Sequence, residues 1–164
     1  MTITRGKKKE IVDELQKSLK GAKAMTFVQF KGLSVVDSTN MRQNLRSESV
    51  GYKVAKKTLL TRTLDTLGIK GAMPSLEGNI AITWSHDDET APARLVYAFR
   101  KGHEDNIALV GGVFQGSYID AIAMNDIAMI PSMQVLRGMF VNVINSPIQG
   151  FVVALNKIAE KRNY

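Results

Sequence analysis

Residues 131–164 read PSMQVLRGMFVNVINSPIQGFVVALNKIAEKRNY, and this stretch decides how the chain is organised. Its apolar residues recur at steps of three and four, which is the spacing of one face of an α-helix. The pattern predicts a long amphipathic helix over the last part of the sequence. The apolar face comprises Met133, Leu136, Phe140, Val143, Ile144, Pro147, Ile148, Phe151, Val152, Leu155, Ile158 and Ala159.

Prolines mark the beginning and the middle of this helix. Pro131 and Ser132 form a start signal, because a serine side chain can accept a hydrogen bond from an unpaired amide of the first turn. Pro147 lacks a backbone donor and clashes with the preceding turn, so we expect straight segments over 133–145 and 147–162, joined at a kink. Pro131, Ser132 and Pro147 are the expected hinge residues. At about 1.5 Å per residue the helix would span roughly 45 Å, so part of it should project.

A terminal helix of this kind has two plausible uses. It can pack on the core of its own domain, as many terminal helices do. The preceding residues 1–130, however, are enough for a domain of ordinary size. An uncovered apolar patch of this extent would also promote aggregation. The pattern therefore favours docking of a partner, with self-packing as the alternative.

The positive charge is concentrated in the first third of the chain. Residues 1–62 carry 14 basic and 5 acidic residues, a net charge of +9, whereas residues 63–164 carry 8 basic and 10 acidic residues, a net charge of −2. The basic residues are spread over several expected elements rather than one run. This distribution predicts a folded basic surface that binds a polyanion.

The composition offers little for catalysis. The 164 residues include no cysteine and two histidines, His86 and His103, and neither histidine has a plausible nucleophile paired with it. The run HDDE at 86–89 could be imagined as a metal site, but an acidic loop before a helix explains it better. Gly111 and Gly112 lack the Lys-Ser/Thr sequel of a phosphate-binding loop. We therefore expect no enzyme, no catalytic residue, no metal and no cofactor.

The rest of the sequence alternates between helical and strand patterns. Apolar spacing and turn residues predict helices over about 6–20, 34–50, 57–67, 91–101 and 119–129, and strands over 24–30, 52–56, 79–84 and 107–114. We expect an α+β fold, with an N-terminal mixed sheet and flanking helices in residues 1–130. A long, kinked, projecting C-terminal amphipathic helix follows in residues 131–164.

The tail does not fit a membrane span by its sequence. A spanning helix needs roughly 18 to 20 uninterrupted apolar residues, and Asn145, Ser146 and Pro147 break the apolar run here. We therefore expect no membrane partner.

Five short motifs occur in a particular order along the chain. They are GLSV at 32–35 after a strand, LR at 45–46, VAKKTLLTR at 54–62, IPS at 130–132 and NSPIQGFVVALN at 145–156. In order, spacing and length they resemble the bacterial stalk-base protein of the large ribosomal subunit, and the resemblance covers essentially the whole chain. One position departs from the family. Where the family usually has Lys-Asn-Thr, this chain has Lys56-Lys57-Thr58, so that Lys57 stands in place of the asparagine. The change removes a side-chain amide and adds a positive charge.

The resemblance implies that residues 1–130 bind large-subunit ribosomal RNA near the site used by translation factors. Most contacts should go to phosphates, since arginine offers a planar fork and lysine a point charge, while structured RNA hides its deep groove. The expected RNA-binding residues are Lys7, Lys8, Lys9, Gly32, Leu33, Arg42, Arg46, Lys56, Lys57, Thr58 and Arg62.

The resemblance also implies that residues 131–164 anchor dimers of a small acidic stalk protein, whose mobile arms deliver translational GTPases. Further implied partners are the GTPases, indirectly, and a neighbouring stalk-base ribosomal protein, and the chain would work in the cytoplasm on the ribosome. The helix has room for about two docking segments, separated at Pro147. The expected partner-binding residues are Phe140, Val143, Ile144, Ile148, Phe151, Val152, Leu155 and Ile158.

Two alternatives remain from the pattern alone. One is a non-ribosomal RNA-binding regulator whose tail serves dimerisation. The other is a membrane-surface protein anchored by the terminal helix, with Lys157, Lys161 and Arg162 at its end. The polar face of the helix is mostly uncharged Asn, Gln and Ser, whereas interfacial helices tend to carry lysine and arginine there.

Overall fold

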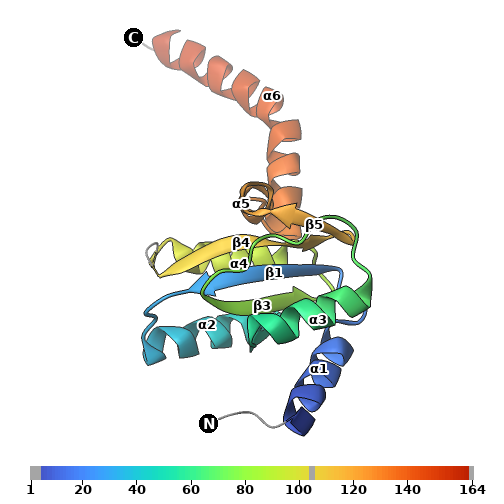
Figure 1. Cartoon of the computed structure of the whole chain (residues 1–164). Coiled ribbons are helices and arrows are strands. Elements are labelled where there is room, and N and C mark those ends of the chain that lie inside the picture. The colour runs from blue at the N-terminus through green and yellow to red at the C-terminus, as the bar shows by residue number, and fades with distance from the viewer. Residues whose placement is uncertain (1–4, 104–105, 163–164) are drawn as a thin grey trace. The chain divides into compact units, whose positions relative to one another are not determined.

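The computed structural model describes residues 5–103 and 106–162, which fall into two compact units that divide between Ile130 and Pro131. Figure 1 shows the elements. The first unit contains α1 (Arg5–Leu19), β1 (Ala24–Phe30), α2 (Val35–Ser47), β2 (Gly51–Val54), α3 (Lys57–Leu67), β3 (Asn79–Ser85), α4 (Ala91–Arg100), β4 (Ile107–Phe114), β5 (Ser117–Asp120) and α5 (Ala121–Ala128). The second unit consists of α6 (Met133–Arg162).

The strands form one five-stranded sheet in the order β2-β3-β1-β4-β5. The α+β class is confirmed, but each neighbouring pair in this order is antiparallel, so the sheet is not mixed as the sequence analysis expected. The reason lies in β3. The helix α2 returns the chain so that β2 runs in the same direction as β1, and β3 then inserts between the two in the opposite direction. The parallel pair that the helical connection would otherwise make is never formed.

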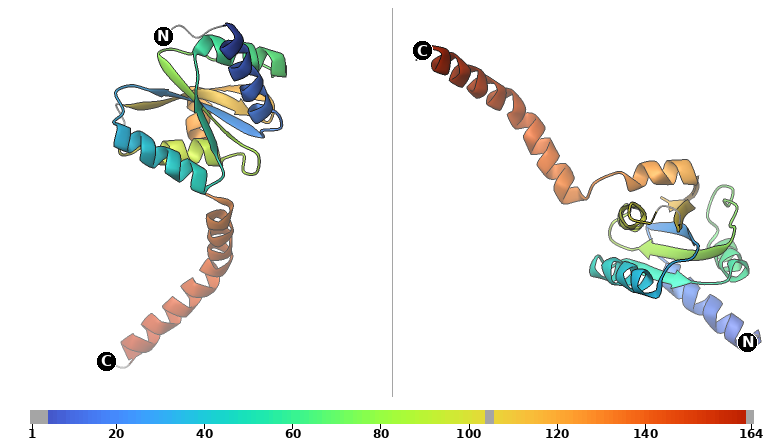
Figure 2. Two further views of the ribbon diagram at one scale, coloured as in Figure 1. Left: turned by 90° about the horizontal axis from the view of Figure 1, so that it is seen from below. Right: turned by 90° about the vertical axis from the view of Figure 1, so that its left-hand side faces the viewer.

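Alternate residues of the central strands supply two separate hydrophobic cores, as the two-residue period of a strand requires. Val28 of β1 and Ala81 of β3 face a core that is completed by α2, α4 and α5. Phe27 and Ile82 face a second core that is completed by α1 and α3. Helices therefore cover both faces of the sheet (Figures 1 and 2).

One strand was missed by the sequence analysis. Residues 119–129 were expected to form a helix, but β4 turns back at Gln115 and Gly116 into β5, and α5 begins only at Ala121. The two turn residues have φ values of 49° and 76°, the left-handed conformation that two-residue hairpin turns require. The apolar residues of β5 continue into α5, so the spacing alone gave one helix.

The pair of glycines in β4 has a structural role. Near them the pairing of β1 with β4 skips a residue, since Phe27 pairs with Gly111 but Val28 pairs with Leu109. A side chain at Gly112 would collide with the carbonyl oxygen of Met25 and the terminal methyl of Met124. Glycine is thus required there so that the strands can approach each other.

Pro147 lies inside α6 and does not end it. The sequence predicts one long helix with a kink at this proline, and the helix runs as a single element from Met133 to Arg162. The ribbon changes direction along its length (Figures 1 and 2). A proline inside a helix leaves one carbonyl without its amide donor and pushes the preceding turn away, which bends a helix without stopping it.

Candidate nucleic-acid and partner interfaces

The beginning of α3 borders a groove of about 720 Å³ that contains three of the expected RNA-binding residues, Lys56, Lys57 and Thr58. The other walls come from Ile11 of α1, the end of β2 and the turn before β3. The local sequence explains why these side chains face outward. Leu59 and Leu60 are buried, and this fixes the rotation of α3 so that the residues before them are exposed.

The electrostatics of this groove favour an anion. Lys56 is the cap residue of α3, and none of the side chains that the structure describes makes a capping hydrogen bond there. Since Leu59 and Leu60 already donate their amides to the Lys56 carbonyl, the amides of Lys57 and Thr58 are the unsatisfied donors of the first turn. Amides at the start of a helix and two lysine side chains together form a site suited to phosphate.

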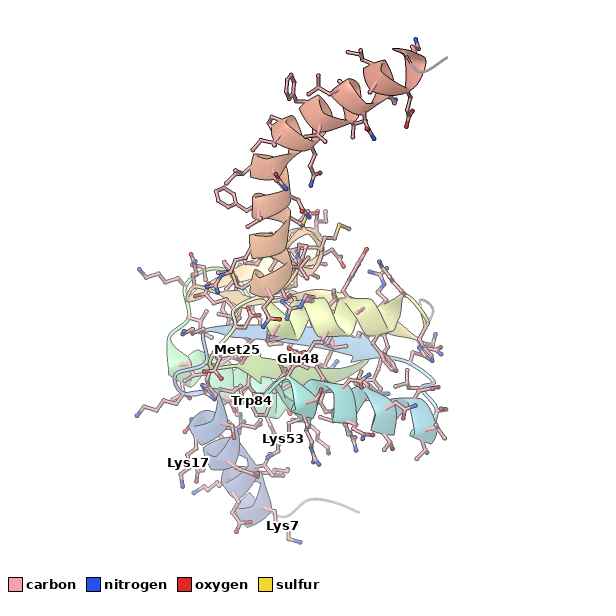
Figure 3. The ribbon with its side chains drawn as sticks, turned by 180° about the vertical axis from the view of Figure 1, so that it is seen from behind. Lys7, Lys17, Met25, Glu48, Lys53 and Trp84 are labelled. Carbon is pink, nitrogen blue, oxygen red and sulfur yellow. The ribbon has the colours of Figure 1, made fainter. Side chains whose placement is uncertain are left out.

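Arg62 extends this surface along α3. It is exposed and lies one turn after Thr58, on the same side of the helix. Lys7, Lys8 and Lys9 are exposed in the first turns of α1, and Figure 3 shows Lys7 at the end of the helix away from the sheet. Of α1, only Ile11 lines the groove, so the structure does not bring the three lysines into it.

Two arginines expected to bind RNA project from α2, because Met41 and Leu45 next to them are buried. The guanidinium carbon of Arg42 lies 5.4 Å from the centre of the Tyr52 ring in β2. This contact connects the surface of α2 with the strand that leads to Lys56. Arg46 lies one turn further on, near the end of α2, and the structure does not bring it to the groove.

The turn between β1 and α2 lies at the same end of the sheet as the groove. Phe30, the last residue of β1, pairs with Asn79, and Val54, the last residue of β2, pairs with Ala81. Gly32 follows with a φ of 68°, and it is exposed. Leu33 packs against the hydrophobic core, so a contact with RNA at this residue would come from its backbone.

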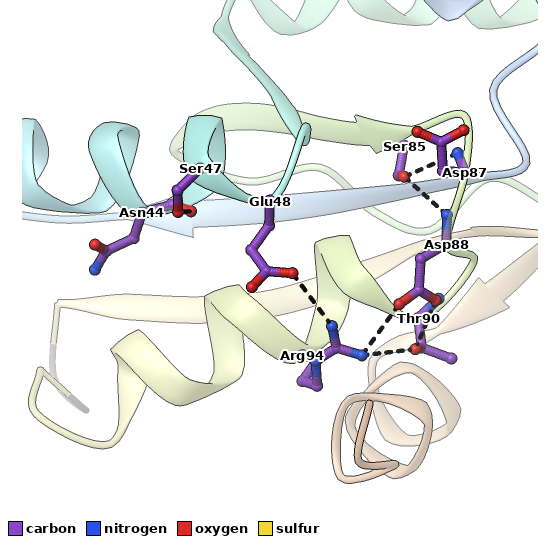
Figure 4. Close-up of polar contacts among 8 residues, drawn as sticks. All are labelled: Asn44, Ser47, Glu48, Ser85, Asp87, Asp88, Thr90 and Arg94. Atoms are coloured by element: carbon purple, nitrogen blue, oxygen red, sulfur yellow. Dashed lines mark hydrogen bonds and ion pairs between the residues drawn. The ribbon is translucent and has the colours of Figure 1, made fainter. Parts of the chain in front are cut away.

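The acidic loop at 86–89 is hydrogen-bonded to the start of α4 through the Asp88 side chain. Asp88 accepts hydrogen bonds from the amide and hydroxyl of Thr90 at 2.9 and 3.0 Å, and Arg94 donates to it at 3.2 Å (Figure 4). Burial raises the pKa of the Asp88 carboxyl, but these hydrogen bonds and the charge of Arg94 lower it by more, so its pKa lies below the usual range. Arg94 also lies 3.9 Å from Glu48. Among residues 5–103 and 106–162, the structure contains no group of three or more His, Asp or Glu side chains that could hold a metal ion.

The second unit presents its apolar side chains to solvent. All eight residues expected to bind a partner are exposed, and Phe140 and Phe151 retain 67% and 66% of their accessible surface. The unit is one helix, so nothing within it covers them. By length and composition the segment Met133–Lys161 could also cross a membrane. This differs from the sequence expectation, which required an uninterrupted apolar run that Asn145, Ser146 and Pro147 break, whereas the average hydropathy of the helix is high enough despite them.

The helix α6 contains an internal repeat that is not among the features predicted from the sequence. Phe140-Val141 followed by Ile144-Asn145 recurs 11 residues later as Phe151-Val152 followed by Leu155-Asn156. Eleven residues make three helical turns to within about 20°, so the two copies share one face and lie about 16 Å apart along the helix. Comparing the helix with itself would have revealed the repeat.

A charged residue on this face was also missed. Arg137 is exposed, and it lies one turn before Phe140 and two turns before Ile144 on the same side of the helix. Its charge is of the sign that would attract an acidic partner.

Comparison with known proteins agrees with the motifs. Residues 3–101 match the family described as ribosomal protein L10. The large ribosomal subunit protein uL10 of Clostridium acetobutylicum is 35% identical over 155 residues, which cover 94% of this chain and 92% of that protein. The protein of the same name from Staphylococcus aureus is 33% identical over 155 residues, covering 94% of this chain and 93% of that protein. With the family match over more than half of its residues and relatives aligned over nearly its full length, this chain belongs to the ribosomal protein L10 family.

Proposed function

We propose that this chain, a structural constituent of the large ribosomal subunit, forms the base of the ribosomal stalk. In this proposal residues 1–130 bind large-subunit ribosomal RNA, and residues 131–164 anchor dimers of the acidic stalk protein. The chain is not an enzyme and works in the cytoplasm, as expected for a bacterial ribosomal protein of this family. The observation that carries the proposal is the division of properties between the two units: the first contains the basic groove, and the second is an exposed apolar helix.

The chemistry of the groove supports RNA binding. Its lysines and free helix amides are donors for phosphate oxygens, and Arg42 and Arg62 extend the same charge over α2 and α3. Such donors read the shape and backbone of a folded RNA rather than its bases. The Lys57 that replaces the family's asparagine lies in the groove, where its charge adds to that of Lys56.

The helix α6 supports partner docking through an apolar face that continues over both copies of the repeat. Fully burying one such side chain contributes about 1.5–3 kcal/mol, and an amphipathic helix laid in a hydrophobic groove is a common mode of recognition. Two copies of one motif on one face fit two identical partners. We therefore propose two dimers, one at Phe140–Asn145 and one at Phe151–Asn156, which would recruit translational GTPases indirectly through their mobile arms.

A neighbouring stalk-base ribosomal protein is a further proposed partner of the first unit. The membrane alternative rests only on the length and composition of α6. Since a ribosomal protein of this family works on the ribosome, we assign the apolar face to protein partners.

Salt-dependent RNA binding tests the first half of the proposal. The variant with Lys56→Gln, Lys57→Gln and Arg62→Gln should bind an in vitro transcript of the large-subunit ribosomal RNA more weakly. The slope of log affinity against log salt should become shallower by about 0.7–0.9 for each phosphate that the variant no longer neutralises.

The matched control carries Lys17→Gln, Lys20→Gln and Lys23→Gln. It removes the same amount of charge at the opposite end of the sheet, since Lys23 precedes the β1 residue that pairs with Ser85. This control should retain most of the slope. Equal reductions in both variants would mean that net charge, and not the groove, determines binding. An unchanged slope in the first variant would overturn the assignment of the RNA-binding surface.

A further inference from the structure

Tyr52 of β2 and Arg42 of α2 form a contact between two elements of the first unit. We call the exposed basic residues Arg42, Lys56, Lys57 and Arg62 the basic surface. The Arg42 guanidinium carbon lies 5.4 Å from the centre of the Tyr52 ring, within the range of a cation–π interaction. The ring is half-buried and packs against the core cluster that includes Met41 and Leu45 of α2. The arginine is exposed. A side chain fixed by the core thus holds a long, flexible side chain at the surface.

We propose that Tyr52 is a positioning residue for RNA binding, which holds the Arg42 guanidinium ready to bind a phosphate. The inference rests on the proposed function of the first unit. A guanidinium that lies against an aromatic ring keeps most of its N–H donors free, because they point outward in its own plane. Those donors match the oxygens of a phosphate as a fork. Holding the side chain before RNA arrives reduces the conformational entropy that binding must remove.

The ion pairs of the chain set Arg42 apart from another arginine of the same unit. Arg94 contacts the carboxylates of Asp88 and Glu48, so its donors are already engaged. Among residues 5–103 and 106–162, none of the ion pairs involves Arg42. The structure therefore contains one arginine held by carboxylates and one held by an aromatic ring, and the second is the one whose charge remains for a ligand.

The protonation state of Tyr52 is consistent with this role. Burial raises the pKa of the phenol above its ordinary value, and the charge of Arg42 and a hydrogen bond from its side chain oppose the rise. The phenol is therefore neutral at neutral pH, and it leaves the charge of Arg42 uncompensated. A phenolate in this place would neutralise the cation and repel RNA.

The same unit offers a matched control. The Lys101 ammonium lies 5.8 Å from the centre of the Tyr97 ring, and Tyr97 packs against the same core cluster as Tyr52. Lys101 lies at the end of α4, outside the proposed RNA-binding residues. Replacing Tyr97 thus removes an aromatic ring from the same core and a similar interaction with a cation, without touching the basic surface.

The experiment measures the affinity of the full chain for the large-subunit ribosomal RNA transcript. Tyr52→Leu should weaken binding about twofold to fivefold, the factor expected from an exposed cation–π interaction. Tyr52→Phe should bind like the wild type, because the ring remains. Tyr97→Leu should also bind like the wild type. Thermal unfolding of Tyr52→Leu and Tyr97→Leu shows whether the two substitutions disturb the core equally.

A double-mutant cycle separates positioning from a general structural effect. In the Arg42→Gln background, Tyr52→Leu should cause no further decrease in affinity. The inference is overturned if Tyr52→Leu binds like the wild type, or if it weakens binding equally with and without Arg42. A wild-type chain that fails to bind the transcript would instead overturn the proposed RNA-binding function, and the inference with it.

Discussion

Replacing Phe151 by aspartate should remove one of two stalk-protein dimers and leave the other bound. Phe151 exposes 66% of its surface, so docking would cover roughly the remaining two-thirds of the side chain. At about 1.5–3 kcal/mol for full burial, that coverage contributes about 1–2 kcal/mol. The aspartate would in addition place an unpaired carboxylate in the interface, which costs several kcal/mol. A total of about 4 kcal/mol weakens this dimer site roughly 1,000-fold.

Native mass spectrometry of the chain with the stalk protein measures this directly. The wild type should carry four copies of the stalk protein, that is, two dimers. Phe151→Asp and Phe140→Asp should each carry two copies, and the double variant should carry none. RNA binding by all three variants should stay at the wild-type level, since the substitutions lie outside the first unit.

Val153→Asp is the matched control, because Val153 is also apolar and exposed but lies two residues on, about 200° around the helix. It should retain both dimers. Equal effects of Val153→Asp and Phe151→Asp would refute the assignment of the docking face. Release of both dimers by either single phenylalanine variant would refute the reasoning that each copy of the repeat holds its own dimer. Loss of RNA binding together with the dimers would mean that the helix belongs to the core of the chain.

Three further predictions concern stability and charge. Gly112→Ala should lower the free energy of unfolding by about 2–3 kcal/mol in chemical denaturation, because the added carbon meets backbone, whereas Gly102→Ala, whose added carbon would lie 3.8 Å from the Phe99 carbonyl oxygen, should change it little. Asp88→Asn should lower the melting temperature at pH 7. Since the folded pKa of Asp88 is lowered, the difference from the wild type should shrink as the pH falls below about 4, and a difference that persists at pH 2 would contradict this. Arg137→Glu should weaken docking of the acidic stalk protein more at low salt than at high salt, and equal weakening at both would exclude an electrostatic role.

Much of the fold follows from local signals. β1 and α3 have the bounds expected from the sequence, because strand-favouring residues between turn signals mark the first and an apolar helical spacing marks the second. Two features depended on other information. The hairpin into β5 needs a turn that no glycine pair or Asn-Gly announces. The antiparallel sheet depends on where β3 inserts, which is a matter of packing between distant segments.

The candidate sites could be predicted as residue types but not as arrangements. The basic residues stand out by composition, and the apolar face of α6 stands out by its period. The sequence could not show that Arg42 contacts Tyr52, because the two residues come from different elements. Nor could it show that Leu33 points into the core, since an apolar residue in a turn has no period to fix its direction.

The place of β1 in the sheet has a consequence for how the chain is made. β1 lies at the centre of the sheet but is the first strand to be synthesised, and the nearest of its partners, β3, ends 55 residues later, at Ser85. At a synthesis rate of about 5–20 residues per second, both edges of this apolar strand remain unpaired for roughly 3–11 s until that partner has been made. During this interval the nascent segment AMTFVQF can pair with strands of other chains. Slow translation of residues 31–85 would lengthen that exposure, so the yield of soluble protein should depend on the speed at which this segment is translated.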